Sequence, residues 1–107
     1  MLASNKIIGI LGGGQLGKMT LEVSNKWGLK IYILDPDENC PSKPFCSKFF
    51  QGDLMDFNTV YNFGKEVDLI TIEIENINVD ALEELKKENK IVYPQPEILK
   101  IIQDKSL

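Results

Sequence analysis

The 107-residue chain contains no histidine and no arginine, so its basic side chains are twelve lysines. Without histidine it lacks the usual general base near neutral pH and the commonest metal ligand, which leaves carboxylates, lysines and backbone amides. The lysines are scattered along the chain, and the formal net charge is −4. Scattered lysines with an acidic balance argue against nucleic acid as a partner.

Cysteines and long apolar runs are also scarce. Cys40 and Cys46 lack the partners of a zinc site and the spacing of a C-x-x-C redox motif, so we interpret them as reduced thiols without a chemical role. No apolar run approaches the roughly 20 residues that span a membrane, and the first six residues lead into a strand-like segment rather than a signal-peptide core. We therefore expect a cytoplasmic protein with no membrane partner.

Short β-rich apolar segments alternate with amphipathic segments along the chain. Strands are expected at 6–11, 30–34, 47–50, 67–74 and 91–93. Helices are expected from about 15 to 27, from about 56 to 65 with Asp56 or Asp53 as cap, at 79–88, and from 94 onward. This alternation predicts one α/β domain over 1–107, a Rossmann-like, doubly wound parallel sheet of about five strands with helices on both faces.

A glycine-rich segment, GGGQLG at 12–17, lies where the first strand ends and the first helix begins. Glycines here permit a tight turn and a close approach of the backbone to a ligand, and the amides of a helix N-terminus attract phosphate. The segment, Gly14 included, is a candidate site for a mononucleotide or sugar phosphate. The alternative is a turn that serves packing alone.

Asp35 ends the second expected strand. In dinucleotide folds an acid near this position binds the ribose hydroxyls of adenosine, so a nicotinamide-binding function stays open. The alternative is an aspartate that forms the turn before Pro36.

Glu73, Glu75 and Asn76 lie at the carboxyl end of the fourth expected strand, the side of an open α/β sheet where ligands bind. The two glutamates share a face if the strand is still extended there. Two carboxylates repel a pyrophosphate but accept hydrogen bonds from ribose hydroxyls or an amine. The group therefore favours a sugar-bearing substrate over a dinucleotide, with a solvated strand end as the alternative.

Four segments together carry a family resemblance: IIGILGGGQLGKM, ILDPDENCP, DLITIEIENI and YPQPEILKIIQDKSL. The combination, which extends over essentially the whole chain, resembles the amino-terminal domain of the carboxyaminoimidazole ribonucleotide synthetases. The resemblance implies a longer ATP-grasp ligase of purine biosynthesis that joins bicarbonate to aminoimidazole ribonucleotide, with ATP and magnesium.

Site residues follow from the same resemblance. Gln15, Leu16 and Glu73 correspond to substrate contacts of related ligases, Asn76 shapes the same pocket, and Glu75 is a further candidate. Lys105, in the QDK segment, is a candidate contact for the ATP phosphates.

The central and C-terminal ATP-grasp portions are absent from the 107 residues, so we expect no catalytic residue, metal ligand or tightly bound cofactor in this chain. The family often forms dimers, which makes a homodimer one expectation. Two alternatives stay open: a nucleotide-binding regulatory module complete as it stands, and the Rossmann domain of an NAD-dependent oxidoreductase.

Overall fold

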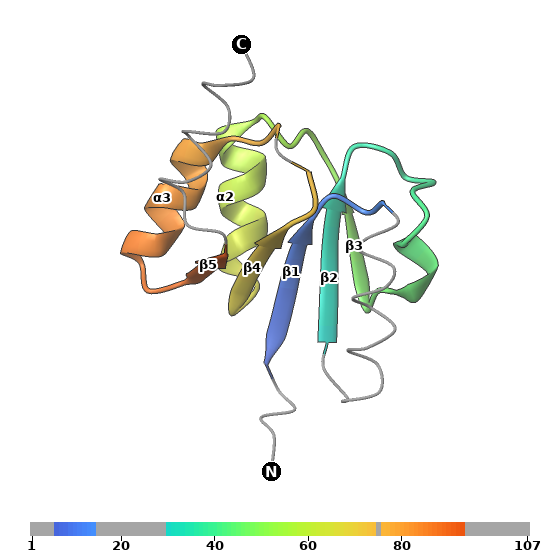
Figure 1. Cartoon of the computed structure of the whole chain (residues 1–107), viewed down its shortest axis with the longest axis horizontal. Helices are drawn as coiled ribbons and strands as arrows, with labels where there is room; N and C mark the ends of the chain where they lie inside the picture. The colour runs from blue at the N-terminus through green and yellow to red at the C-terminus, as the bar shows by residue number, and fades with distance from the viewer. Residues whose placement is uncertain (1–5, 15–29, 75, 94–107) are drawn as a thin grey trace.

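A computed structural model describes residues 6–14, 30–74 and 76–93 (Figure 1). These residues form a five-stranded, all-parallel sheet in the order β3-β2-β1-β4-β5. The strands are β1 (Ile7–Leu11), β2 (Lys30–Asp35), β3 (Lys48–Gln51), β4 (Leu69–Ile72) and β5 (Ile91–Tyr93).

The strand order creates a switch point in the middle of the sheet. β1 pairs with both β2 and β4, so that Ile8 lies between Ile31 and Leu69. The chain continues from β2 to β3 on one side of β1 and then crosses to β4 and β5 on the other side. Loops leave the carboxyl ends of β1 and β4 in diverging directions at such a point, which opens the crevice where α/β proteins bind ligands.

Two helices, α2 (Phe57–Lys65) and α3 (Val79–Lys87), pack side by side against one face of the sheet (Figure 1). Each begins at a side-chain cap: an Asp56 carboxylate oxygen accepts the amide of Thr59 at 2.9 Å, and Asn78 Oδ1 accepts the amide of Ala81 at 2.9 Å. Their apolar sides and the sheet form one core, with these buried members: Leu11, Leu34, Leu54, Val60, Phe63, Val67, Ile70, Ile77, Val79, Ala81, Leu82, Leu85 and Val92.

The central strands also bury side chains on their opposite face. Ile10, Ile31 and Ile33 are nearly inaccessible there, and Phe49 packs against them. A strand buried on both faces reads as a continuous apolar run, which explains why β1 and β2 show no alternation in the sequence. The connection from β2 to β3 contains one short 3-10 helix, η1 (Lys43–Phe45).

Most predicted elements are confirmed to within one or two residues, and Asp56, not Asp53, caps α2. The predicted strand at 67–74 is too long at both ends. At the start, the Val67 amide donates to the Gly64 carbonyl in the turn after α2, and an Asp68 carboxylate oxygen accepts the amide of Ile7, so β4 begins only at Leu69. At the other end, β4 stops at Ile72. The helices predicted at 15–27 and from 94 onward lie outside the described residues. No helix in the described ranges is long and apolar enough to cross a membrane.

Candidate functional site

The first glycine of the loop continues the β1–β2 pairing and then turns the chain. The Gly12 amide donates to the Leu34 carbonyl at 2.8 Å, and its φ of 105° lies in the left-handed region that side chains rarely adopt. A Cβ at this position would lie only 2.8 Å from the Cγ2 atom of Ile74. Glycine is therefore required here by both backbone conformation and space.

The carboxylate of Glu73 lies directly against this loop. Ideal Cβ positions on Gly12 and Gly14 would come within 2.6 Å of its Oε1 atom and 2.5 Å of its Oε2 atom, respectively. The Glu73 backbone is fixed as well, because its amide donates to the Leu11 carbonyl at 2.9 Å. The structure thus brings together two predicted site residues, Gly14 and Glu73, at the switch point between β1 and β4.

Asp35 has a different task from the one expected in a dinucleotide site. One of its carboxylate oxygens accepts the Gly13 amide at 2.7 Å, and the other accepts the Asp37 amide at 2.8 Å. Both oxygens are thus engaged by backbone donors, as in the turn-forming interpretation. The turn alone therefore accounts for the position of Asp35.

Two further residues of the β2–β3 connection hold the glycine loop, and no motif in the sequence predicts either contact. Ser42 is completely buried; its amide donates to the Gly13 carbonyl at 3.0 Å and its hydroxyl donates to the Gly14 carbonyl at 2.7 Å. Cys40 packs so closely on Gly13 that a Cβ there would lie 2.5 Å from the Cys40 sulfur. Burial, followed by the charge of Asp35, raises the pKa of the Cys40 thiol, which keeps it protonated and unreactive.

The other predicted site residues divide into two groups. Asn76 is described and exposed, just past the end of β4. Gln15, Leu16, Glu75 and Lys105 lie outside the described residues. The condition under which Glu73 and Glu75 would share a strand face is not met, because β4 ends at Ile72. Within the described ranges, no group of three potential ligands could hold a metal ion.

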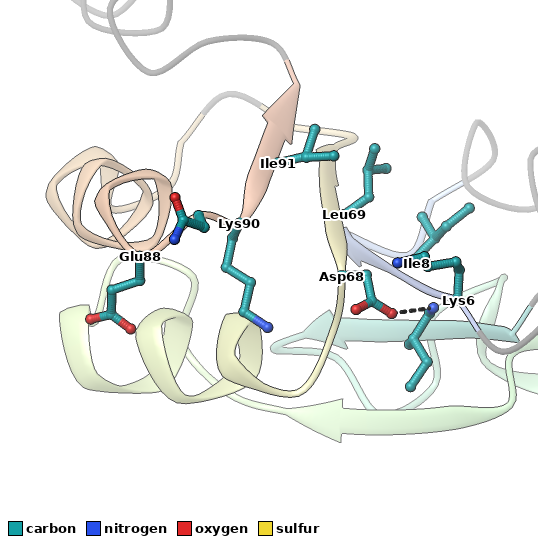
Figure 2. Close-up of a pocket in the computed structure, with 9 residues that line it drawn as sticks. Lys6, Ile8, Asp68, Leu69, Glu88, Lys90 and Ile91 are labelled. Carbon is teal, nitrogen blue, oxygen red and sulfur yellow. Dashed lines mark hydrogen bonds between the residues drawn. The ribbon is translucent and has the colours of Figure 1, made fainter. Parts of the chain in front are cut away.

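A separate cavity of about 490 Å³ opens at the opposite, amino-terminal edge of β1, β4 and β5 (Figure 2). Its lining includes Lys6, Ile8, Asp68, Glu88, Lys90 and Ile91. Two of its polar groups already serve the fold, since Asp68 accepts the Ile7 amide at 2.8 Å and the Lys90 ammonium donates to the Val67 carbonyl at 2.7 Å. This cavity is remote from the switch point, so we place the functional site at the glycine loop.

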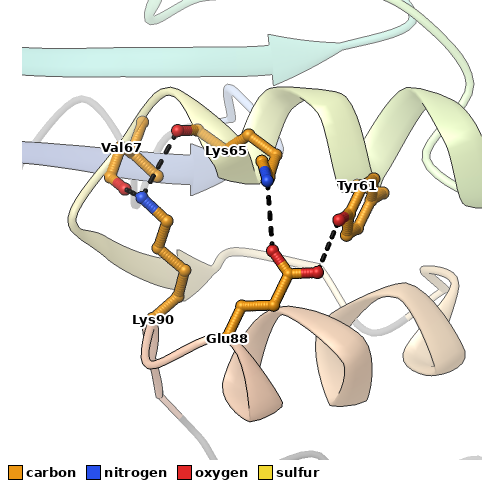
Figure 3. A network of polar contacts seen from close by, with 5 residues as sticks. All are labelled: Tyr61, Lys65, Val67, Glu88 and Lys90. Carbon is orange, nitrogen blue, oxygen red and sulfur yellow. Dashed lines mark hydrogen bonds and ion pairs between the residues drawn. The ribbon is translucent and has the colours of Figure 1, made fainter.

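Glu88, which lines this cavity, links α2 to the end of α3 (Figure 3). Its carboxylate accepts the Tyr61 hydroxyl on one oxygen and the Lys65 ammonium, at 3.2 Å, on the other. The Tyr61 hydrogen bond, followed by that of Lys65, lowers the pKa of the Glu88 carboxyl. The arrangement links α2 to the end of α3 and touches no residue of the glycine loop.

A parallel sheet of order 3-2-1-4-5 with a glycine-rich turn at its switch point defines a nucleotide-fold α/β domain. The family described as "Ribonucleotide synthetase preATP-grasp domain" matches residues 5–103. The chain belongs to this family, as the four sequence segments predicted.

Relatives and solved structures agree with this assignment. The chain is 38% identical to N5-carboxyaminoimidazole ribonucleotide synthase of Staphylococcus aureus over 99 residues, and this aligned region covers 92% of this chain and 26% of the relative. It is 37% identical to a chloroplastic phosphoribosylaminoimidazole carboxylase of Vigna aconitifolia, over 92% of this chain and 18% of the relative. The chain therefore spans about a quarter or less of these proteins.

Among solved structures, N5-carboxyaminoimidazole ribonucleotide synthetase from Thermotoga maritima superposes with a TM-score of 0.86 at 35% identity, covering 92% of this chain and 27% of that one. The Aspergillus clavatus synthase, crystallised with ADP and aminoimidazole ribonucleotide, superposes with a TM-score of 0.84 at 32% identity, over 95% and 27% of the two chains.

Proposed function

We propose that this chain is the ribonucleotide-binding N-terminal domain of an ATP-grasp ligase that carboxylates aminoimidazole ribonucleotide in purine biosynthesis. The single observation that carries the proposal is the Glu73 carboxylate against Gly12 and Gly14 at the switch point. A carboxylate there can accept two ribose hydroxyls at once, at the edge of the sheet where α/β proteins bind ligands. The solved relative with aminoimidazole ribonucleotide bound supports the choice of ligand.

In this proposal the two halves of the chemistry lie on different parts of a longer protein. ATP phosphorylates bicarbonate to carboxyphosphate, and the substrate amine then attacks its carbon, releasing phosphate and a proton. The present domain holds the ribonucleotide through Gly14, Gln15, Leu16 and Glu73. Asn76 shapes the same pocket, and Glu75 is a further candidate contact. Lys105 is the candidate contact for the ATP phosphates.

The remaining portions of the ligase would supply the magnesium ligands and the cationic groups that phosphoryl transfer requires. Bicarbonate and ATP are accordingly partners of the whole enzyme, which we propose to be a cytoplasmic homodimer.

The decisive test of the pocket is Glu73→Gln in the ligase that contains this domain. An amide accepts hydrogen bonds at only one end, and hydrogen bonds to charged groups contribute about 1.5–3 kcal/mol, so kcat/KM for the ribonucleotide should fall about tenfold to a hundredfold. Steady-state kinetics with each substrate varied in turn measures this. Glu75→Gln is the matched control and should cost less; a defect confined to the KM for ATP would show that Glu73 does not hold the ribonucleotide.

Calorimetry on the 107-residue chain separates the alternatives. Heat on addition of aminoimidazole ribonucleotide, with none on addition of NAD, is the expected result. Binding of NAD would instead support the oxidoreductase alternative. An open reading frame that continues past Leu107 into an ATP-grasp region would exclude the regulatory module.

A further inference from the structure

A single buried residue, Ser42, donates hydrogen bonds to two successive carbonyl groups of the glycine loop. Ser42 donates its amide to the Gly13 carbonyl at 3.0 Å and its hydroxyl to the Gly14 carbonyl at 2.7 Å. The hydroxyl is fully enclosed, and a buried hydroxyl of this kind is costly to leave without a partner. Two successive peptide planes of the loop are thereby fixed from the β2–β3 connection.

This arrangement has a stereochemical consequence for the loop amides. In a planar trans peptide the N–H group points opposite to the C=O group. Since the Gly13 carbonyl accepts the Ser42 amide, the Gly14 amide of the same peptide unit points away from the β2–β3 connection. The Ser42 hydroxyl holds the carbonyl of the next peptide unit, so Gly14 is restrained on both sides of its Cα atom. The Gly13 amide is already engaged by Asp35, so the loop does not offer that donor to a ligand.

We propose that Ser42 is a positioning residue of the ribonucleotide site: its backbone and hydroxyl bonds together restrain Gly14 so that the Gly14 amide is held toward an oxygen of the sugar-phosphate part of the ligand. The acceptor is either a phosphate oxygen or a ribose hydroxyl, which present the same chemistry to an amide donor. The inference rests on the proposed function, and it adds a residue from the second strand connection, 28 positions from the carbonyl that its hydroxyl contacts.

The test is Ser42→Ala in the isotope-labelled chain, followed by NMR titration with aminoimidazole ribonucleotide. The variant keeps the Ser42 backbone bond to Gly13 and loses only the hydroxyl bond to Gly14, so it should remain folded. We expect the Gly14 amide resonance of the wild type to shift on binding. The affinity of the variant should be about threefold to tenfold lower, because Gly14 is then held through the Gly13 carbonyl alone and its amide is less firmly oriented.

Ser47→Ala is the matched control. Ser47 lies at the other end of the same connection, where its hydroxyl accepts the Ile31 amide at 3.4 Å, remote from the loop carbonyls. Its replacement should leave ribonucleotide affinity unchanged. An equal loss of affinity in both serine variants, or wild-type affinity in Ser42→Ala, would overturn the positioning role.

Two further ligands separate the remaining outcomes. Titration with the aminoimidazole riboside, which lacks the phosphate, identifies the acceptor. If Ser42→Ala binds the riboside as well as the wild type does, the acceptor is a phosphate oxygen. If the loss of affinity persists with the riboside, the acceptor is a ribose hydroxyl. Ribose phosphate tests the loop without the base. If the chain binds ribose phosphate but not the ribonucleotide, and Ser42→Ala again lowers the affinity, the result would support the positioning role and contradict only the proposed function. Binding of neither would contradict both.

Discussion

At the scale of single residues, Gly12 and Gly14 are required for different physical reasons although the same carboxylate covers both. Gly12 has a left-handed φ of 105°, and a Cβ there would also strike Ile74. At Gly14 the nearest obstacle to a Cβ is the far end of the flexible Glu73 side chain, at 2.5 Å. The first glycine therefore supports the fold, whereas the second keeps the Glu73 carboxylate in place.

This difference predicts opposite effects of the two alanine variants. Gly14→Ala should displace Glu73 and weaken ribonucleotide binding about tenfold or more, with little change in the free energy of unfolding, because a flexible side chain yields at low cost. Gly12→Ala should lower the free energy of unfolding by at least about 1–2 kcal/mol, the cost of the left-handed conformation alone. Denaturant unfolding and calorimetry measure the two quantities. Unchanged affinity in Gly14→Ala would mean that the loop is a packing turn only.

At the scale of elements, Asn78 connects the start of α3 to the segment before α2. Its Oδ1 atom caps α3, its Nδ2 atom donates to the Met55 carbonyl at 3.0 Å, and its backbone amide donates to the Leu54 carbonyl at 2.8 Å. The start of α3 is thus fixed to the segment that precedes α2.

Asn78→Ala should lower the free energy of unfolding by about 1–2 kcal/mol, because it removes the helix cap and a side-chain hydrogen bond together. Asn78→Asp keeps the cap acceptor but lacks the donor for Met55, so it should lose less. Denaturant unfolding compares these variants with Asn62→Ala, an exposed position on α2 where the same substitution should change little. Equal losses at positions 62 and 78 would refute the connecting role.

The Glu88 contacts between α2 and α3 predict a specific acid sensitivity. Because the folded state lowers the pKa of Glu88 below its ordinary value of 4.5, the carboxylate contributes stability above that pH, and the contribution is lost as the pH falls through the lowered pKa. Glu88→Gln should therefore be less stable than the wild type near neutral pH and lose less stability on acidification.

Thermal unfolding between about pH 3 and pH 7 measures this convergence. Glu84→Gln, on the same helix, is the matched control and should follow the wild-type pH dependence. A constant difference between Glu88→Gln and the wild type across this range would show that the charge of Glu88 plays no part.

The sequence predicts the bounds of the strands better than it predicts the contacts that shape the candidate site. Apolar runs such as those of β1 and β5 depend on local pattern, and their bounds were predicted to within a residue. The contacts that shape the loop join residues 22 and 28 positions apart, and nothing in the local pattern of Asp35 or Ser42 specifies a partner at that separation. For Asp35 the sequence left a ligand role and a turn role open, and the hydrogen bonds of its two oxygens show the turn role.

At the scale of the whole molecule, we propose that this chain supplies ribonucleotide binding and that the rest of a longer ligase supplies the groups for phosphoryl transfer. Phosphoryl transfer to bicarbonate requires bound magnesium and positioned cations at the transferred group. No cluster of potential metal ligands occurs in the described ranges, and the chain has neither histidine nor arginine. It matches 26% of the Staphylococcus aureus synthase and 27% of the Aspergillus clavatus synthase.

We therefore predict that the 107-residue chain alone has no ATP-dependent carboxylase activity, even where it binds the ribonucleotide. The measurement is ADP release with ATP, magnesium, bicarbonate and aminoimidazole ribonucleotide, with the complete Staphylococcus aureus synthase as the positive control. We expect ribonucleotide-stimulated turnover from the complete synthase and none from the chain, because a substrate held at Glu73 still lacks an activated carboxyl donor. ADP release by the chain that depends on both bicarbonate and ribonucleotide would contradict this division of labour, and it would place a complete catalytic site within these 107 residues.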